Sequence, residues 1–286
     1  MTATTTTTED GRLAVPPSPE QVAIGGGWYR AGLNALTMLT PIAVIILIWE
    51  LTARFSGWPA AIFPPISDIF AAIYELAREG LLWQDITGTL GRLFKSVIIG
   101  IFVGTLLGAL MGYFKYWERA MVAPMNFLLA IPGTAMFPLS MLWFGLTELA
   151  ITSILMYEVA LTVMLNTWTG VKTVDSALIK AGRAFGVKGL GLFLRVLIPA
   201  ALPSIISGYR LAFSRCWRIL IVAEMLVSVS SGLGYRIYWA REFFHSDIVY
   251  GALFVVGIIG LLIERVFLRT LEVMTVERWG TMRELD

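Results

Sequence analysis

Residues 180–203 read KAGRAFGVKGLGLFLRVLIPAALP and separate two strongly hydrophobic stretches of the chain. The segment holds four basic residues, four glycines, two prolines and no acidic residue. Apolar residues recur at helical spacing before Gly186, and a second apolar run with basic residues leads to Pro199 and Pro203. The pattern predicts a short helix, a glycine turn and a second helix. The short helix would lie across a membrane surface, where a partner can bind it. The simpler alternative is that the whole segment is an ordinary basic cytoplasmic loop.

The composition around this segment is that of a membrane protein. Of the 286 residues, 57% are hydrophobic and 15% charged. A bilayer core takes about 20 apolar residues as helix. Three uncharged runs of about this length occupy 31–49, 96–114 and 120–147. Three further spans that tolerate some charge are expected at 148–169, 200–228 and 248–263, the last continuing toward 268. We therefore expect an all-α polytopic membrane protein with six transmembrane helices.

The flanking segments differ in character from the spans. Residues 1–30 are rich in Thr, Pro and Gly and are expected to form a disordered tail before a first helix at 31–55. Residues 56–91 form an outer segment in which Ile69, Phe70, Ile73 and Tyr74 recur at helical spacing, with Ser67 as a possible cap and Gly80 as the stop. This predicts an interfacial helix, with a plain packing helix as the alternative. Five spans follow over 92–270, and a tail over 271–286.

The distribution of basic residues predicts the orientation. If the N-terminus is cytoplasmic, thirteen Lys and Arg fall on the cytoplasmic side, against five outside, which are Arg54, Arg78, Arg92, Arg236 and Arg241. Cytoplasmic loops of membrane proteins carry an excess of Lys and Arg, so both termini and residues 180–203 are expected on the cytoplasmic side.

The spacing within the opening segment resembles the coupling motif of binding-protein-dependent ABC importer permeases: EAA, three residues, Gly, nine residues, Ile-x-Leu-Pro. Here Lys180, Ala181 and Gly182 occupy the EAA places, with Arg183 next, Gly186 follows at the right distance, and Val196 to Pro199 close the pattern. Lysine replaces the glutamate and glycine the second alanine. Lys180 thus reverses the charge offered to an ATPase; either the ATPase groove carries a compensating acid or this position is peripheral.

Five further stretches resemble the nitrate/sulfonate/taurine/bicarbonate subgroup of these permeases. They are TLGRLFKSVIIGIFVGTLLGALMGY, PLSMLWFG, LNTWTGVKTVD, LPSIISGYRLAF and VAEMLVSVSSGLGY. The resemblance implies the type I (MetI-like) permease fold over 92–270, with a cytoplasmic coupling segment at 171–199 in a bacterial inner-membrane protein. It also implies a second permease copy, two cytoplasmic ATP-binding subunits that hold ATP and Mg, and an extracytoplasmic solute-binding protein, besides membrane lipid.

The chemistry of the chain is consistent with this division of labour. The sequence contains no G-x-x-x-x-G-K-[ST] loop, so ATP hydrolysis is expected on another chain, and no catalytic residues are assigned. One Cys and one His cannot form a metal cluster within one chain. No cofactor, metal or nucleic-acid partner is expected. Gly100, Gly104, Gly108 and Gly112 place a stripe of small residues on one helix face, which predicts close helix packing without identifying the partner helix.

Charged residues inside the spans are candidates for the translocation pathway. A charge at membrane depth costs about 2.5–3.5 kcal/mol on insertion scales, so Arg215 and Arg218 require partners or water. They could lower the barrier for an anion such as a sulfonate, nitrate or carboxylate. Alternatively, one of them pairs with Glu158 as a buried ion pair.

Prolines mark the third expected span. Pro124, Pro132 and Pro138 predict a kinked or partly unwound helix. Broken helices often line cavities in transport proteins, so Met136, Phe137 and Trp143 are candidate pathway residues, with core packing as the alternative for each.

The sequence therefore predicts a permease subunit of an ATP-driven importer for a small anionic solute of the sulfonate/taurine, nitrate or bicarbonate type. The same architecture could instead carry an aromatic carboxylate or a pyrimidine vitamin precursor. An ATP-independent channel, a secondary transporter and a membrane-embedded enzyme are the alternatives of other classes. A membrane-embedded enzyme is disfavoured because the expected spans contain no clustered His or Cys residues and no paired carboxylates.

Overall fold

The computed structural model describes residues 27–227 and 230–268, with side chains described from Thr40 to Arg265 outside the gap at 228–229. The chain divides into two compact units, Met1–Trp58 and Pro59–Asp286. In the first, helix α2 spans Gly27–Phe55 and contains the expected first span. An ion pair joins Arg54 Nε to Glu50 Oε1 at 2.7 Å across one helical turn. The two predicted tails lie outside the described residues, except 27–30, which begin α2.

The expectation of a helical membrane protein is confirmed. Within the described residues, four helices are long and apolar enough to cross a membrane: Leu81–Tyr113, Glu148–Lys172, Gly189–Leu226 and Ser246–Arg265. A bent pair, Lys115–Ala130 with Gly133–Phe144, makes a fifth if it counts as one span. Six spans remain a prediction, because the side chains of the first part of α2 lie outside the described residues.

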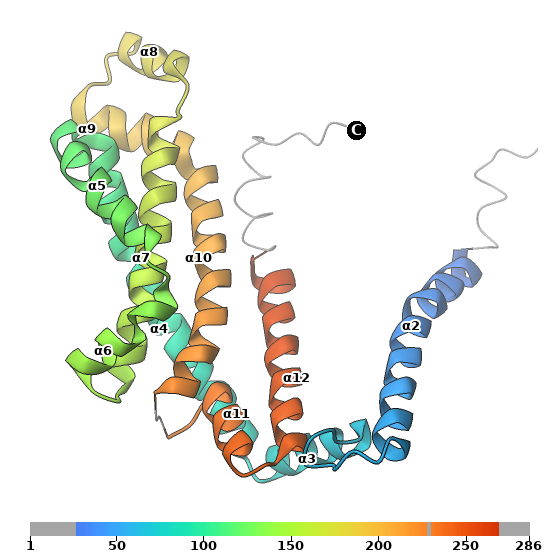
Figure 1. Ribbon diagram of the computed structural model, residues 1–286. Coiled ribbons are helices and arrows are strands. Elements are labelled where there is room, and N and C mark those ends of the chain that lie inside the picture. The colour runs from blue at the N-terminus through green and yellow to red at the C-terminus, as the bar shows by residue number, and fades with distance from the viewer. Residues whose placement is uncertain (1–26, 228–229, 269–286) are drawn as a thin grey trace, which may run out of the picture. The chain divides into compact units, whose positions relative to one another are not determined.

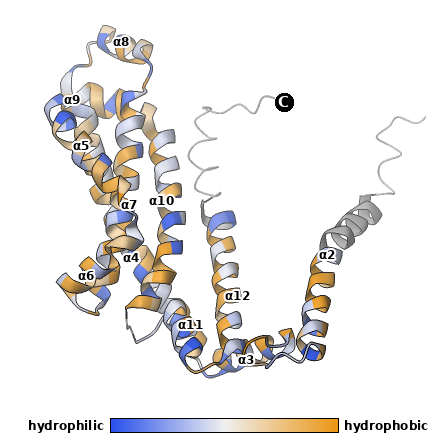
Figure 2. Ribbon diagram, in the orientation of Figure 1, coloured by the Kyte–Doolittle hydropathy of each residue, from blue (hydrophilic) through white to orange (hydrophobic). Residues whose placement is uncertain are grey.

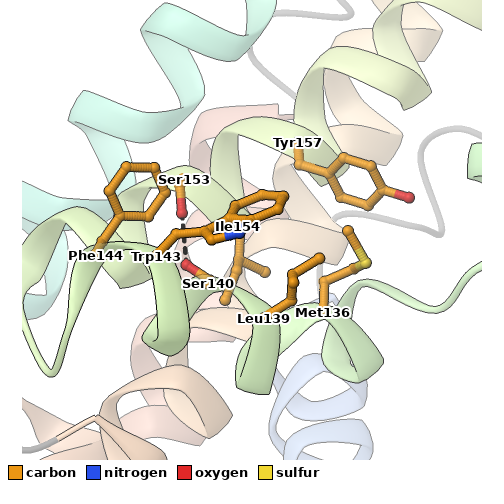
Figure 3. A pocket seen from close by; sticks show the side chains of 8 residues that line it. All are labelled: Met136, Leu139, Ser140, Trp143, Phe144, Ser153, Ile154 and Tyr157. Atoms are coloured by element: carbon orange, nitrogen blue, oxygen red, sulfur yellow. Dashed lines mark hydrogen bonds between the residues drawn. The ribbon is translucent and has the colours of Figure 1, made fainter.

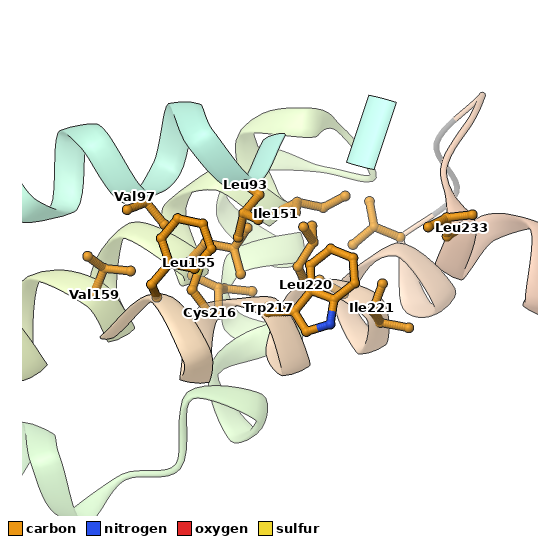
Figure 4. Close-up of a cluster of buried hydrophobic side chains, with 14 of the residues drawn as sticks. Leu93, Val97, Ile151, Leu155, Val159, Cys216, Trp217, Leu220, Ile221 and Leu233 are labelled. Atoms are coloured by element: carbon orange, nitrogen blue, oxygen red, sulfur yellow. The ribbon is translucent and has the colours of Figure 1, made fainter. Parts of the chain in front are cut away.

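Three helices form the core of the second unit: α4 (Leu81–Tyr113), α7 (Glu148–Lys172) and α10 (Ile198–Leu226). Figure 1 shows them side by side, and Figure 4 shows the side chains that fill the space between them. Leu93 of α4, Leu155 of α7 and Leu220 of α10 have no exposed surface. The apolar stripes of three helices thus meet in one buried cluster.

The glycine stripe of α4 packs against α7 of the same chain. A Cβ added at Gly104 would lie 2.5 Å from the carbonyl oxygen of Ala160, and one at Gly108 would lie 2.6 Å from that of Met164. At Gly100 and Gly112 the added Cβ would lie 2.6 and 2.7 Å from the side chains of Val159 and Val171. The backbones of α4 and α7 can approach this closely because these positions carry no side chain.

Helix α3 (Ile66–Arg78) buries one face and leaves the other open. Its buried residues are Ile69, Ala72 and Leu76, while Phe70 and Tyr74 are exposed. Gly80 has φ 80° and ends the helix as expected. The predicted cap was wrong: no side chain caps α3, and the Ser67 hydroxyl donates to Asp68.

Helix α4 begins earlier than its hydrophobicity indicated. Its first residue is Leu81, so residues 81–91, assigned to an outer segment, extend the second span by three turns. Asp85 and Arg92 are almost fully buried there. A hydropathy criterion ends a span at such residues, whereas these side chains find partners on neighbouring helices.

The predicted break in the third span is confirmed. Helix α5 (Lys115–Ala130) is followed by the 3₁₀ turn η1 (Gly133–Met136) and α6 (Phe137–Phe144), with a bend of 89°. The break falls at Pro132, which cannot continue the helical hydrogen bonding. Pro124 lies inside α5, and Pro138 lies in the first turn of α6.

The remaining elements are α8 (Ser176–Ala184), α9 (Gly189–Leu192), the π turn η2 (Phe193–Leu197), α11 (Leu233–Glu242), α12 (Ser246–Leu262) and the π turn η3 (Ile263–Leu268). Within the second unit, α8 lies at one end of the bundle, and α3 and α11 lie at the other (Figure 1). Hydrophilic residues gather on α11, while most of α12 is apolar (Figure 2).

Pro199 does not interrupt the helix in which it lies. Helix continues from Gly189 through Pro199 to Leu226. Proline lacks the N–H of a regular turn, and here the turn before it widens, with Ile198 N donating to the carbonyl of Phe193. The chain thereby accommodates the proline without a break.

Candidate coupling segment and translocation pathway

Helix α8 is defined at both ends by local hydrogen bonds. The Asp175 carboxylate accepts from Ala177 N at 2.8 Å and caps the start. At the end, Gly186 has φ 82° and donates to the Arg183 carbonyl, while Val187 N donates to that of Gly182. This arrangement is a Schellman motif, which requires a residue in the left-handed region. The predicted short helix and glycine turn are both present.

The motif positions lie on an exposed helix. Lys180, Ala181 and Arg183 are exposed, and Phe185 is 87% exposed. Gly182 turns inward, and a Cβ there would lie 2.9 Å from Leu192 Cδ1. Glycine at this position lets α8 lie close to the following helix, so the two motif residues before it face away from the bundle.

The charged residues of α10 have different partners. Arg215 Nη1 lies 3.6 Å from Glu158 Oε1 of α7. Arg218 Nε donates to the backbone carbonyl of Ser214 at 3.3 Å, one turn back on its own helix. Of the two pairings left open by the sequence, the structure thus contains the one with Arg215. Glu158 also lies against the break in the bent pair, since a Cβ on Gly133 would lie 2.7 Å from its Oε2.

A small cavity of about 200 Å³ lies between α6 and α7 (Figure 3). Met136 and Trp143 line it together with Tyr157 and the hydroxyls of Ser140 and Ser153, which are 2.8 Å apart. Phe137 does not line it: its side chain is 1% exposed and belongs to the core cluster. The candidate pathway role of Phe137 is therefore replaced by core packing, whereas Met136 lines the cavity.

A buried polar cluster, which we call the α11 clamp, consists of Asp85, Thr89, Arg92 and Glu224. Helix α11 begins at a glycine N-cap with no capping side chain of its own. Its first N–H groups donate instead to other helices: Gly232 N to Asp85 Oδ1 at 2.9 Å, Leu233 N to Thr89 Oγ1 at 2.9 Å and Gly234 N to Glu224 Oε2 at 3.0 Å. Helices α4 and α10 therefore cap α11 from outside its own sequence.

Arg92 joins the clamp to two further elements. Its Nη1 donates to Glu224 Oε1 at 2.7 Å and to the Ser231 carbonyl at 2.8 Å, and its Nη2 to Glu148 Oε1 at 3.0 Å. The Glu224 side chain has no exposed surface, so this charge must be compensated locally. Arg236 Nε donates to Asp85 Oδ2 at 2.7 Å. Each buried carboxylate of the clamp is thus paired with an arginine: Glu224 with Arg92 of the clamp, and Asp85 with Arg236 of α11.

Sequence reasoning missed the clamp. It assigned Arg92 and Arg236 to outer loops, and both side chains are largely buried. A signal was present, because Asp85, Thr89 and Arg92 recur at spacings of four and three and so share one helix face. Their partner Glu224, 132 residues after Arg92, carries no local signal.

The comparisons with known proteins agree with the fold. Residues 96–270 match the family described as "Binding-protein-dependent transport system inner membrane component". The chain is 33% identical over 232 residues to the putative aliphatic sulfonates transport permease SsuC of Escherichia coli (strain K12), covering 79% of this chain and 88% of that protein. It is 31% identical over 246 residues to SsuC of Bacillus subtilis (strain 168), covering 86% of each.

A solved structure shares the architecture. A chain of the MetNI methionine ABC transporter, in an inward-facing conformation, superposes with a TM-score of 0.57 at 20% identity, covering 67% of this chain and 96% of that chain. The fold is therefore that of a type I ABC importer permease. The chain belongs to the family of binding-protein-dependent transport permeases and is a permease subunit of an importer for small solutes.

Proposed function

We propose that this permease imports a small anionic solute of the aliphatic sulfonate type, driven by ATP hydrolysis on two partner subunits. The observation that carries the proposal is α8, a capped and exposed helix at one end of the bundle that holds the coupling-motif positions. The cargo class is supported by the sulfonate permeases among its relatives and by the cationic side chains of α10.

The proposed assembly contains a second copy of this chain, two cytoplasmic ATP-binding subunits and an extracytoplasmic solute-binding protein within the lipid of a bacterial inner membrane. Both termini and α8 lie on the cytoplasmic side, with α3 and α11 on the other. Closure of the ATPases acts through Lys180, Ala181, Arg183 and the turn at Gly186, and the bundle alternates between inward-facing and outward-facing states. Met136 and Trp143 line the pathway with the charged residues of α10.

A different cargo is the alternative within the same architecture. An aromatic carboxylate would present a planar carboxylate to the same arginines. An ATP-independent channel does not need a helix that binds an ATPase, so the presence of the coupling segment with α8 disfavours a channel.

The test is copurification with the ATPase. Gly186→Pro should abolish copurification of the ATP-binding subunit from detergent extracts, because proline cannot adopt φ 82° and lacks the N–H that bonds to Arg183. Gly191→Ala in the same segment is the matched control, since an added Cβ there meets only Val187 at 3.5 Å.

The expected result is wild-type recovery of the ATPase with Gly191→Ala and at least a tenfold loss with Gly186→Pro at equal permease abundance. A wild-type permease that transports without any ATPase, or a Gly186→Pro variant that retains it fully, would contradict the proposal.

A further inference from the structure

Helix α10 is covered by the chain on three sides. Cys216 and Leu220 lie in the core shared with α4 and α7. Trp217 faces α12, where a Cβ on Gly260 would lie 2.8 Å from the indole nitrogen. Ile219 faces η1, with Cδ1 3.4 Å from an added Cβ on Gly133. The fourth side carries exposed residues, namely Ser207, Leu211, Arg218 and Val222.

Arg218 lies in the interior of this open side. It is eight residues from Leu226, the end of α10, which corresponds to about 12 Å of helix. Among the described residues, no carboxylate lies within ion-pair distance of Arg218, and its one hydrogen bond uses Nε. Its two terminal nitrogens are therefore free to bind an acceptor on the open side.

A position facing lipid would leave the terminal N–H groups of the Arg218 guanidinium without hydrogen-bond acceptors. Hydrocarbon offers no acceptor, and charged side chains in transmembrane segments face water-filled cavities or partners. In the assembled importer, the open side of α10 therefore faces a partner or a water-filled path.

The neighbouring charges define what that solute can be. Arg215 precedes Arg218 by three residues, so the two side chains are neighbours on the helix. The Arg215 guanidinium lies 3.6 Å from Glu158 Oε1, longer than a hydrogen bond, and its side chain is 44% exposed. Two guanidinium groups and one carboxylate leave a net charge of +1, which one monovalent anion neutralises.

We propose that Glu158, Arg215 and Arg218 form a transit site for one monovalent oxyanion, such as a sulfonate or a carboxylate. The terminal nitrogens of Arg218 bind the anion, and Glu158 reduces the charge of Arg215 so that the anion is released again. A site with a net charge of +2 would hold a monoanion more tightly and would favour a dianion. This inference rests on the proposed importer function and specifies its substrate class.

The experiment uses the complete importer, with its ATPase and solute-binding protein, in proteoliposomes. ATP-driven uptake of labelled ethanesulfonate and benzoate is measured for the wild type, Arg218→Gln, Arg218→Lys and Arg241→Gln. Arg241 is a matched control because its pair with Glu242 is exposed and lies in α11, outside the spans.

Arg218→Gln should lower uptake of the transported anion at least tenfold while ATPase content and ATP hydrolysis stay within twofold. Arg218→Lys should retain at least a third of the uptake rate, because it keeps the charge, and Arg241→Gln should match the wild type. Wild-type uptake by Arg218→Gln at equal abundance overturns the site. So does a wild-type importer that carries a neutral solute and neither anion.

Glu158→Gln provides a second test if Arg218→Gln fails to assemble. It keeps the size of the side chain and raises the net charge to +2, so sulfate should inhibit anion uptake at a concentration at least fivefold lower than in the wild type. Unchanged inhibition by sulfate overturns the charge balance. If the wild type neither binds an ATPase nor uses ATP, the importer proposal fails. If the wild type imports normally and the Arg218 and Glu158 variants do so as well, the transit site alone fails.

Discussion

At the scale of single residues, two glycines of α4 differ only in what surrounds them. Gly104 lies against the backbone of α7, and a Cβ there would lie 2.5 Å from the Ala160 carbonyl oxygen. Gly91, on the same helix, has open space where its Cβ would be. From the sequence the two glycines look alike. The structure shows that Gly104 is required for packing against α7, whereas Gly91 has room for a side chain.

This contrast gives a stability prediction. Gly104→Ala should destabilise the purified permease by about 1–3 kcal/mol, because a backbone carbonyl cannot move away as a flexible side chain can. Gly91→Ala should leave stability unchanged or raise it by up to about 1 kcal/mol, from the higher helix propensity of alanine. Thermal unfolding in one detergent measures both. Equal melting temperatures for the two variants would show that α4 and α7 are not in backbone contact.

At the scale of elements, α11 depends on other helices for its start. Thr89 Oγ1 donates to Glu224 Oε2 at 2.9 Å and accepts from Leu233 N at 2.9 Å, and its side chain is fully buried. Thr87, half a turn away, is exposed and donates only to carbonyls of α4. The clamp thus depends on the hydroxyl of Thr89, whereas the hydroxyl of Thr87 takes no part in it.

Thr89→Val should therefore destabilise the protein by about 1–3 kcal/mol, because valine keeps the shape of the side chain and leaves a buried donor and a buried carboxylate without this partner. Thr87→Val is the matched control and should change stability by less than about 0.5 kcal/mol. Hydrogen exchange of the Leu233 amide adds a local measurement, with faster exchange expected for Thr89→Val alone. Unaltered exchange in that variant would contradict the capping role.

At the scale of the whole molecule, the proposed orientation places α8 inside and the turn between α3 and α4 outside. Lys188 and Glu79 are exposed in these two regions, and the native Cys216 is fully buried. The wild-type chain can therefore serve as the background for thiol labelling, since its own cysteine is inaccessible.

In intact cells, a membrane-impermeant maleimide should label Glu79→Cys and leave Lys188→Cys unlabelled until the membrane is permeabilised. The expectation follows from the excess of basic residues on the side of α8. Wild-type protein should stay unlabelled under both conditions. Labelling of Lys188→Cys in intact cells would reverse the proposed topology.

Local patterns were enough for several features of the fold and the candidate site. Hydrophobic runs predicted a helical membrane protein, the spacing around Gly186 predicted the short helix and its turn, and Pro132 predicted the break in the third span. Each of these depends on residues a few positions apart, whose propensities act within the same turn or helix. The spacing around Gly186 is also part of the motif that carries the family resemblance.

Tertiary structure decided which surfaces meet. The glycine stripe could have faced any helix, and it faces α7. Glu158 could have paired with either arginine, and it lies beside Arg215. Arg92 looked like a loop residue, and it is buried against Glu224, 132 positions away. The physical reason is the same in each case: periodicity fixes which side of a helix is small, polar or apolar, but only packing determines what covers it, and a buried charge is tolerated only where that packing supplies its partner.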